Sequence, residues 1–188
     1  MIQDTPIRQF LDELASASPT PGGGSVAAIM GALGAALVAM VCQLTLGKKG
    51  YESVDAEMAE ILPSAEALRG RMLALVAADI EAFDTVMAAY RLPRESDPVA
   101  RGERIQSALK AATRVPLDCA HACMELIQLC QSVADKGNRN VISDAGVGVM
   151  AASAALRSAA LNVQVNTGSI RDEAFVAAAQ EELNALLR

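Results

Sequence analysis

The 188-residue sequence has no tryptophan, one histidine and only 3% aromatic residues, although hydrophobic residues make up 52% of it. A core with so few aromatic rings has to be filled by alanine, leucine, valine, isoleucine and methionine, whose side chains permit close helix packing. The length suffices for one domain with its own core and is short for two. We therefore expect a single domain spanning residues 1–188.

The sequence also lacks any block of basic residues. Its formal net charge is −6, so it has no general attraction for phosphate backbones or anionic lipid, and we expect neither nucleic acid nor membrane as a partner. The first ten residues, MIQDTPIRQF, lack the basic flank and the apolar run of a signal peptide. We expect the protein in the cytoplasm, with its thiols reduced.

The cysteines do not form a metal-binding pattern. The four of them, Cys42, Cys119, Cys123 and Cys130, include no CxxC, and the last three recur at four- and seven-residue steps on one helix face. His121 lies two residues from Cys119 and Cys123 and so points away from that face. We expect the thiols to be small core residues and predict no metal site.

Helical periodicity runs through the chain, and no stretch outside NVQVN alternates for long enough to make a convincing strand. NVQVN is itself embedded in helical periodicity. This predicts an all-α fold, a compact helical bundle with two buried Ala/Gly-rich helices and long amphipathic helices. The expected helices are residues 5–17 capped by Thr5, 26–46 capped by Ser25, 52–91 with a break or kink near Pro63, a segment ending at Lys136 and interrupted near Pro116, a segment from Ser143 or Asp144 to about Asn166, and 171–187. Residues 92–98 read as a loop.

The two Ala-rich helices, 26–46 and 145–165, are apolar almost all round. The first is long enough to span a membrane, but it is dominated by alanine and glycine and carries Gln43 and Thr45 at its end, so a buried central helix explains it better. A helix apolar on every side has to be surrounded. We therefore expect a dimer with these helices at or next to the subunit contact, where Gly31 and Gly34 would let backbones approach closely.

The stretch PTPGGGS, residues 19–25, precedes the first Ala-rich helix. Three glycines there can expose backbone N–H groups at the positive end of the helix, an arrangement that receives anionic groups. No strand precedes them and no GxxxxGK[ST] follows, so the stretch does not match a nucleotide P-loop. A tight turn against a crowded helix is the competing interpretation.

Three further groups of polar residues could carry chemistry. Lys48 and Lys49 follow the same helix and either stabilise its negative end or attract an acidic ligand tail. Asp79 lies at the edge of an apolar stripe, as a boundary residue bonded to a neighbouring helix or as a site acid. Asn162 and Asn166 share one helix face, suited to reading a heterocycle edge or to a polar contact between helices.

A second polar loop gathers Asn138, Asn140, Ser143 and Asp144. Helix capping explains Ser143 or Asp144 but does not explain the whole cluster. Loops that collect polar groups on a rigid frame often make sites.

Taken in order, FLDELAS, PTPGGGSVAA, LTLGKKGY, DIEAF, GNRNVISDAGV and LNVQVN resemble the cyclodeaminase domain of formiminotransferase-cyclodeaminase and its stand-alone bacterial relatives, from about Phe10 to Phe175. The resemblance implies an all-helical homodimer that handles tetrahydrofolate one-carbon units without a metal or a permanently bound cofactor. It implies catalytic roles for Asp144 first and Asp79 second. The substrate-binding residues that it implies are Pro21, Gly22, Gly23, Gly24, Ser25, Lys48, Lys49, Asn138, Asn140, Ser143, Asn162 and Asn166.

The resemblance implies cyclisation of 5-formimidoyltetrahydrofolate to 5,10-methenyltetrahydrofolate with release of ammonia. The alternative within the family is a 5,10-methenyltetrahydrofolate cyclohydrolase that gives 10-formyltetrahydrofolate. Both reactions need a carboxylate near a cationic, amidine-like carbon. An alternative of another class is a helical dimer that binds a ligand and catalyses nothing.

Overall fold

A computed structural model describes residues 2–93 and 97–188 of the chain, and over these residues it contains helices and no strand. The predicted all-α fold is confirmed. The elements are η1 Ile2–Asp4, α1 Ile7–Leu14, α2 Gly23–Gln43, η2 Glu52–Val54, α3 Asp55–Arg91, α4 Pro98–Lys136, η3 Arg139–Val141, α5 Ile142–Thr167 and α6 Glu173–Leu186. Part of the loop expected over residues 92–98, namely 94–96, lies outside the described residues.

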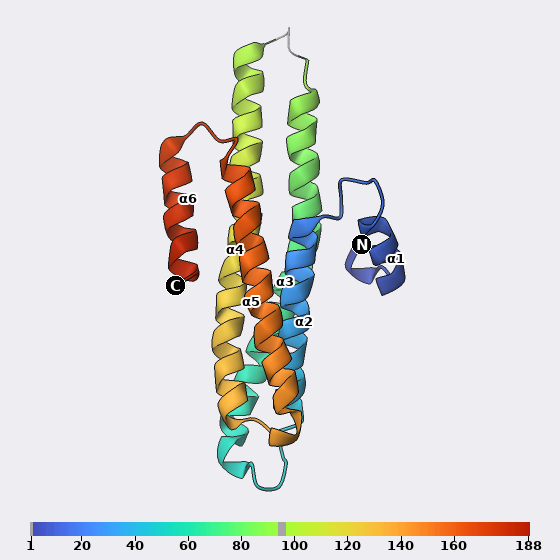
Figure 1. The fold of residues 1–188 in the computed structure, drawn as a ribbon, viewed down its shortest axis with the longest axis vertical. Helices are drawn as coiled ribbons and strands as arrows, with labels where there is room; N and C mark the ends of the chain where they lie inside the picture. Colours follow the sequence, from blue (N-terminus) through green and yellow to red (C-terminus); the bar gives the residue numbers. More distant parts are fainter. Residues whose placement is uncertain (1, 94–96) are drawn as a thin grey trace.

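Four long helices, α2 to α5, run side by side along the length of the molecule (Figure 1). Helices α3 and α4 are the two longest helices, and both extend past the start of α2. Helix α6 lies beside α4 and α5, and α1 stands apart near the start of α2. The centre is filled by fully buried Met, Leu and Val side chains, among them Val38, Met72, Leu117, Leu126 and Val163. The aliphatic core expected from the composition is therefore present.

The glycines of α2 serve packing within the chain. A Cβ atom at Gly34 would lie 3.0 Å from the carbonyl oxygen of Gly148 on α5, and one at Gly31 would lie 2.7 Å from the Met72 side chain on α3. Both glycines are buried. The expectation that they line a contact between subunits is therefore wrong, because α3 and α5 of the same chain already occupy their side of the helix.

Helices α3 and α4 run unbroken through Pro63 and Pro116, so a break at Pro63 and the interruption expected near Pro116 are wrong. A proline leaves the carbonyl four residues earlier without its helical donor. At Pro116 that carbonyl belongs to Ala112, and the Asn166 side chain donates to it from α5 at 3.0 Å. At Pro63 it belongs to Ala59, which is exposed and open to water. Long-range packing and hydration thus compensate for both prolines.

The helix starts also differ from those expected. Helix α1 follows Pro6, with no side-chain cap from Thr5. Ser25 lies inside the first turn of α2, because Gly22 is the N-cap. Helix α5 begins directly from the 3-10 turn η3, so Ser143 and Asp144 lie inside its first turn and do not cap it. The capping hydrogen bond is made before η3, where the side chain of Asn138 accepts from the backbone N–H of Asn140.

Helix α6 is attached by ion pairs as well as by the buried Ala179 and Leu183. Glu182 accepts from His121 at 2.7 Å and from Arg114 at 3.1 Å. The hydrogen bond from His121 is the main cause that lowers the pKa of Glu182, with the Arg114 charge adding to it. Asp172 caps the helix and pairs with Lys110 at 2.6 Å.

Acid is expected to weaken the attachment of α6. A carboxyl whose pKa is lowered by folding stabilises the native state above its unfolded pKa, and that stabilisation is lost as the pH falls through its folded pKa. Wild type should therefore be more stable than Glu182→Gln near pH 6, by no more than about 1 kcal/mol because the pair is partly exposed. The difference in unfolding free energy should shrink as the pH falls below the unfolded pKa of glutamate and vanish once the pH lies below the folded pKa of Glu182. A difference that does not change with pH would contradict this role of Glu182.

All four cysteines are free and buried. Burial raises the pKa of Cys42 and of Cys130 to about 11, so these thiols stay protonated at neutral pH. The prediction that cysteines serve as small core residues is confirmed. Residues 2–93 and 97–188 contain no group of three His, Cys, Asp or Glu side chains placed to hold a metal ion.

Two segments, Gly23–Gln43 and Arg139–Thr167, are long and apolar enough to cross a membrane by length and composition alone. In the first, 61% of the most hydrophobic window is buried inside the bundle, as expected of a core helix. In the second, only 39% is buried. Helix α5 therefore has a larger uncovered apolar side than α2.

Candidate active site

A cavity of about 260 Å³ lies at the start of α2, in the space above its first turn. Four elements and the preceding turn contribute to its wall. The lining residues are Pro19, Thr20, Gly22, Gly23, Gly24, Asp79, Ala82, Phe83, Val86, Leu109, Ala112, Asn162 and Asn166. The cavity thus brings together the three glycines, one of the two candidate carboxylates and both candidate asparagines.

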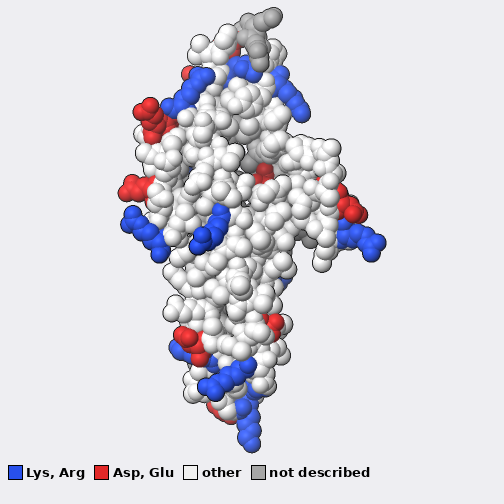
Figure 2. All heavy atoms as spheres, viewed as in Figure 1, with Lys and Arg blue, Asp and Glu red and all other residues white. Residues whose placement is uncertain are grey.

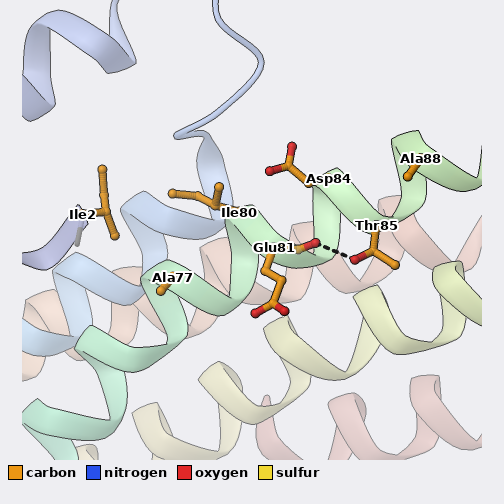
Figure 3. A pocket seen from close by; sticks show the side chains of 7 residues that line it. All are labelled: Ile2, Ala77, Ile80, Glu81, Asp84, Thr85 and Ala88. Carbon is orange, nitrogen blue, oxygen red and sulfur yellow. Dashed lines mark hydrogen bonds between the residues drawn. The ribbon is translucent and has the colours of Figure 1, made fainter.

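A larger, more open cavity of about 540 Å³ lies between η1 and the outer side of α3. Figure 3 shows Glu81, Asp84 and Thr85 at its wall, together with apolar side chains that include Ile2 and Ile80. None of the candidate residues lines it. We take the smaller cavity as the candidate active site because converging polar groups in an apolar wall are the mark of a ligand site, whereas volume alone is not.

Asp79 lies directly against the first turn of α2. Its Oδ2 accepts a hydrogen bond of 2.8 Å from the Ser25 hydroxyl. A Cβ atom at Gly24 would lie only 2.0 Å from Asp79 Oδ1 and 2.6 Å from its Cγ. Position 24 therefore has to be glycine for the carboxylate to keep this place, so the glycine stretch is more than a turn.

The first turn of α2 also has backbone N–H groups without a helical acceptor, at the end of the helix that lies at the cavity. The first intrahelical hydrogen bond runs from the N–H of Val26 to the carbonyl of Gly22. The N–H groups of Gly23, Gly24 and Ser25 precede it and have no acceptor within the helix. Together they give this end of the helix a partial positive charge, which attracts an anionic group.

Asn162 and Asn166 each combine a structural bond with a place in the cavity wall. Asn162 Nδ2 donates to the carbonyl of Ser158 at 2.8 Å, and Asn166 Nδ2 donates to that of Ala112 at 3.0 Å. Asn166 therefore makes a polar contact between α5 and α4, which was the alternative to a ligand-binding role. Each amide retains a second N–H and a carbonyl oxygen for a ligand.

The apolar side chains of the cavity wall were not among the site residues predicted from the sequence. Phe83, Val86 and Leu109 supply surfaces against which a flat ring can pack. Phe83 follows Asp79 by one helical turn, so helical spacing from the chosen carboxylate could have found it. Pro19 and Thr20 were also missed, whereas Pro21 is buried and is not among the lining residues.

The other candidate residues lie at the far end of α2 and α5. Because α2 has 21 residues and a helix rises 1.5 Å per residue, this end is roughly 30 Å from the cavity. We call it the basic tip and define it as Lys48, Lys49 and residues 138–144. One chain therefore does not bring Asp144 and Asp79 into one site.

Hydrogen bonds hold the basic tip together. The backbone N–H of Asn138 donates to Thr45 Oγ1, and its side chain donates to the carbonyl of Leu44, both at 2.9 Å. The N–H of Arg139 donates to the Tyr51 hydroxyl at 2.9 Å. Asn138 is 4% exposed, and these hydrogen bonds give its buried polar groups their partners. Asn140, Ser143 and Lys49 are exposed, whereas Lys48 and Asp144 are half-buried.

A helix N-terminus, one carboxylate and two amides thus surround a small cavity with a mixed polar and apolar wall in an all-helical protein, an arrangement suited to a small organic ligand. The chain matches the family model described as Formiminotransferase-cyclodeaminase over residues 6–185. It therefore belongs to this family, and the resemblance found in its motifs is confirmed.

Known relatives of the chain include a methenyltetrahydrofolate cyclohydrolase and a formimidoyltransferase-cyclodeaminase. The chain is 55% identical over 183 residues to a methenyltetrahydrofolate cyclohydrolase of Methylorubrum extorquens, covering 96% of this chain and 88% of that one. It is 35% identical to the formimidoyltransferase-cyclodeaminase of Sus scrofa over 97% of this chain, which spans only 34% of that protein. The crystal structure of a formiminotetrahydrofolate cyclodeaminase from Thermotoga maritima superimposes with a TM-score of 0.92 at 34% identity, over 100% of this chain and 90% of that one.

Proposed function

We propose that this protein is a tetrahydrofolate one-carbon enzyme that hydrolyses 5,10-methenyltetrahydrofolate to 10-formyltetrahydrofolate. The observation that carries this choice is the 55% identity to the Methylorubrum extorquens cyclohydrolase, which extends over nearly the full length of both chains. The cavity is chemically suited to the reaction, because it offers a carboxylate beside apolar walls and amides. We further infer that the enzyme acts as a cytoplasmic homodimer.

The substrate carries a positive charge spread over N5, the bridging carbon and N10. The Asp79 carboxylate, fixed by Ser25 and the first turn of α2, stabilises that charge and orients a water molecule toward the carbon. Asn162 and Asn166 bond the edge of the pterin ring with their remaining amide groups, while Phe83 packs against a ring face.

Proton transfer completes the reaction. Water forms a bond from its oxygen to the bridging carbon as Asp79 accepts one of its protons, which gives a neutral tetrahedral adduct. The bond from carbon to N5 then breaks, and Asp79 returns its proton to N5. The adduct hydroxyl loses its proton to solvent and becomes the formyl oxygen on N10. One water is consumed and one proton is released overall.

The second candidate is the cyclodeaminase reaction, favoured by the match to the Thermotoga maritima structure over the whole chain. There N10 attacks the carbon of the protonated formimidoyl group on N5, and ammonia leaves as the 5,10-methenyl cation forms. Asp79 would take the N10 proton and deliver it to the departing nitrogen. The same carboxylate and the same two amides serve both reactions, so substrate turnover has to decide between them.

Purified protein should be mixed with 5,10-methenyltetrahydrofolate, and the loss of its near-ultraviolet absorbance followed against the uncatalysed rate. The same protein should be given 5-formimidoyltetrahydrofolate, with appearance of that absorbance and release of ammonia as readouts. Catalysed loss in the first assay supports the cyclohydrolase. Turnover in the second assay alone selects the cyclodeaminase, and binding without turnover in either selects a non-catalytic ligand-binding dimer.

The two lysines of the basic tip are expected to bind a polyglutamate tail. Replacing Lys48 and Lys49 with alanine should raise KM several-fold more for a polyglutamylated substrate than for the monoglutamate, because only the former carries the extra carboxylates. Lys136→Ala is a matched control, since Lys136 is already paired with Glu57 at 2.8 Å. Equal changes in KM for both substrates would show that Lys48 and Lys49 do not bind the polyglutamate tail.

A further inference from the structure

A buried proline, Pro116, lies in the middle of α4. An internal proline destabilises a helix, because it has no N–H for the carbonyl four residues earlier and its ring presses against that carbonyl. The carbonyl concerned is that of Ala112, a residue that lines the candidate active site. Pro116 therefore alters the hydrogen bonding of a backbone group at the cavity wall.

The carbonyl that Pro116 leaves without a helical donor holds the side chain of Asn166. Nδ2 of Asn166 donates to the carbonyl oxygen of Ala112 at 3.0 Å. A carbonyl oxygen only accepts hydrogen bonds, so the NH₂ end of the amide has to face Ala112 and the Oδ1 end has to face away from it. The hydrogen bond therefore fixes the direction of the amide.

Oδ1 of Asn166 remains available to a ligand. It accepts no hydrogen bond within the described parts of the chain, where no buried side-chain oxygen lacks a partner. Oδ1 is therefore not sealed inside the protein. Since Asn166 is half-buried in the cavity wall, its amide presents this acceptor to a molecule in the cavity.

The second amide of the cavity has no comparable anchor. Asn162 Nδ2 donates to the carbonyl of Ser158 at 2.8 Å, and that carbonyl is also the helical acceptor of the Asn162 backbone N–H within α5. The side chain therefore shares its acceptor with the backbone. At Ala112 the proline removes this competition, so Asn166 is the amide with the better-defined direction.

The direction of an amide matters in this cavity because the wall carries little charge. Asp79 is the only charged side chain among the described residues that line it, and Figure 2 shows mainly uncharged surface around the start of α2. One edge of a pterin ring carries N–H donors, at N3 and at the 2-amino group. An Asn166 amide turned the other way would place its own N–H groups against those donors, and neither side would have a partner.

Resting on the function proposed above, we propose that Pro116 is a positioning residue of the active site. It frees the carbonyl of Ala112 so that this carbonyl can hold Nδ2 of Asn166, and Oδ1 then accepts a hydrogen bond from the N–H edge of the pterin. The proline inside α4 thus supports substrate binding and has no part in proton transfer, which belongs to Asp79.

Pro116→Ala tests this role. Alanine restores the backbone N–H at position 116, which competes with Asn166 for the carbonyl of Ala112. We expect KM for 5,10-methenyltetrahydrofolate to rise by about three- to tenfold, the effect of one ordinary hydrogen bond. The value of kcat should stay within about twofold of wild type, because Asp79 is held by Ser25. A fall in kcat with an unchanged KM would overturn the proposal.

Pro63→Ala is the matched control, since Pro63 is the proline in the interior of α3. The carbonyl that it frees belongs to Ala59, which is exposed to water and is not part of the cavity wall. KM and kcat of this variant should match wild type within about twofold. An equal rise in KM in both proline variants would mean that the place of Pro116 beside Asn166 does not matter, and would also overturn the proposal.

A double-mutant cycle with Asn166→Ala shows whether Pro116 acts through Asn166. Asn166→Ala should raise KM at least as much as Pro116→Ala does. In the Asn166→Ala background, Pro116→Ala should have no further effect on KM, because the amide that it disturbs is gone. Effects that multiply in the double variant would contradict the proposed role.

Pro116→Val gives the cycle a second route. Valine also restores the N–H at position 116 and keeps more of the buried volume than alanine does, so it replaces alanine if Pro116→Ala does not fold. Failure of both variants to fold would show that Pro116 is required for the fold itself, and the positioning role would be refuted.

Binding of tetrahydrofolate gives a readout that does not depend on turnover, since this ligand has the pterin edge but no one-carbon group to react. Its Kd, measured by titration calorimetry, should follow the same cycle as KM. Coupled changes in Kd in a protein that turns over neither folate would refute the proposed function and support the role of Pro116. Turnover of 5,10-methenyltetrahydrofolate with independent effects of the two substitutions would refute the role of Pro116 and leave the function standing. Neither binding nor turnover would refute both.

Discussion

Replacing Asp79 with asparagine is expected to reduce kcat by at least about 10²-fold, the usual contribution of a general acid–base group. The amide is nearly isosteric, and its oxygen can still accept the hydrogen bond from Ser25, so the local fold should persist. The charge that stabilises the cationic substrate and the base that takes the water proton are both lost. Steady-state assays with 5,10-methenyltetrahydrofolate measure the effect, with circular dichroism to check helix content.

Asp84→Asn is the matched control for that experiment. Asp84 lies on the same helix five residues later, but its side chain is exposed and lines the outer cavity instead of the candidate site (Figure 3). This variant should keep wild-type kcat and KM within about twofold, since surface substitutions usually have small effects. Activity of Asp79→Asn close to that of Asp84→Asn would show that the reaction does not use the cavity carboxylate.

The second large effect is expected from Gly24→Ala. The new methyl group would lie 2.0 Å from Asp79 Oδ1, so the carboxylate has to move away from Ser25 and from the helix start. A displacement of this kind costs on the order of 10²-fold in turnover when it misplaces a reacting group. The fold itself should not suffer, because alanine is preferred to glycine in a helix by up to about 1 kcal/mol.

Gly23→Ala separates this steric effect from a general effect of stiffening the glycine stretch. A methyl group at position 23 would lie 3.8 Å from Asn162 Nδ2, an ordinary contact. We expect this variant to retain activity within a few-fold and to show a thermal midpoint similar to that of Gly24→Ala. Equal losses in the two variants would mean that flexibility of the glycine stretch matters and that the place of Asp79 does not.

Helical periodicity was sufficient to select several residues that the structure brings together. Asp79 stood out because it lies at the edge of an apolar stripe, and Asn162 with Asn166 because they lie one turn apart. Each of these signals depends only on residues of one helix. They identify a face, and in this fold that face lines the cavity.

Features that depend on two distant segments were not predictable in the same way. The continuity of α4 through Pro116 requires Asn166, fifty residues later, to donate to the carbonyl of Ala112. The role of Gly24 requires Asp79 on another helix. The separation of Asp144 from Asp79 follows from the lengths of α2 and α5, which the motifs alone did not relate to one another.

The central claim is that a folate reacts in the cavity at the start of α2, and a crystal structure of the Asp79→Asn variant soaked with 5,10-methenyltetrahydrofolate tests it most directly. The account predicts density for the pterin between Phe83 and the two asparagines, with the bridging carbon beside residue 79. Folate bound elsewhere on the chain, with this cavity empty, would contradict the account.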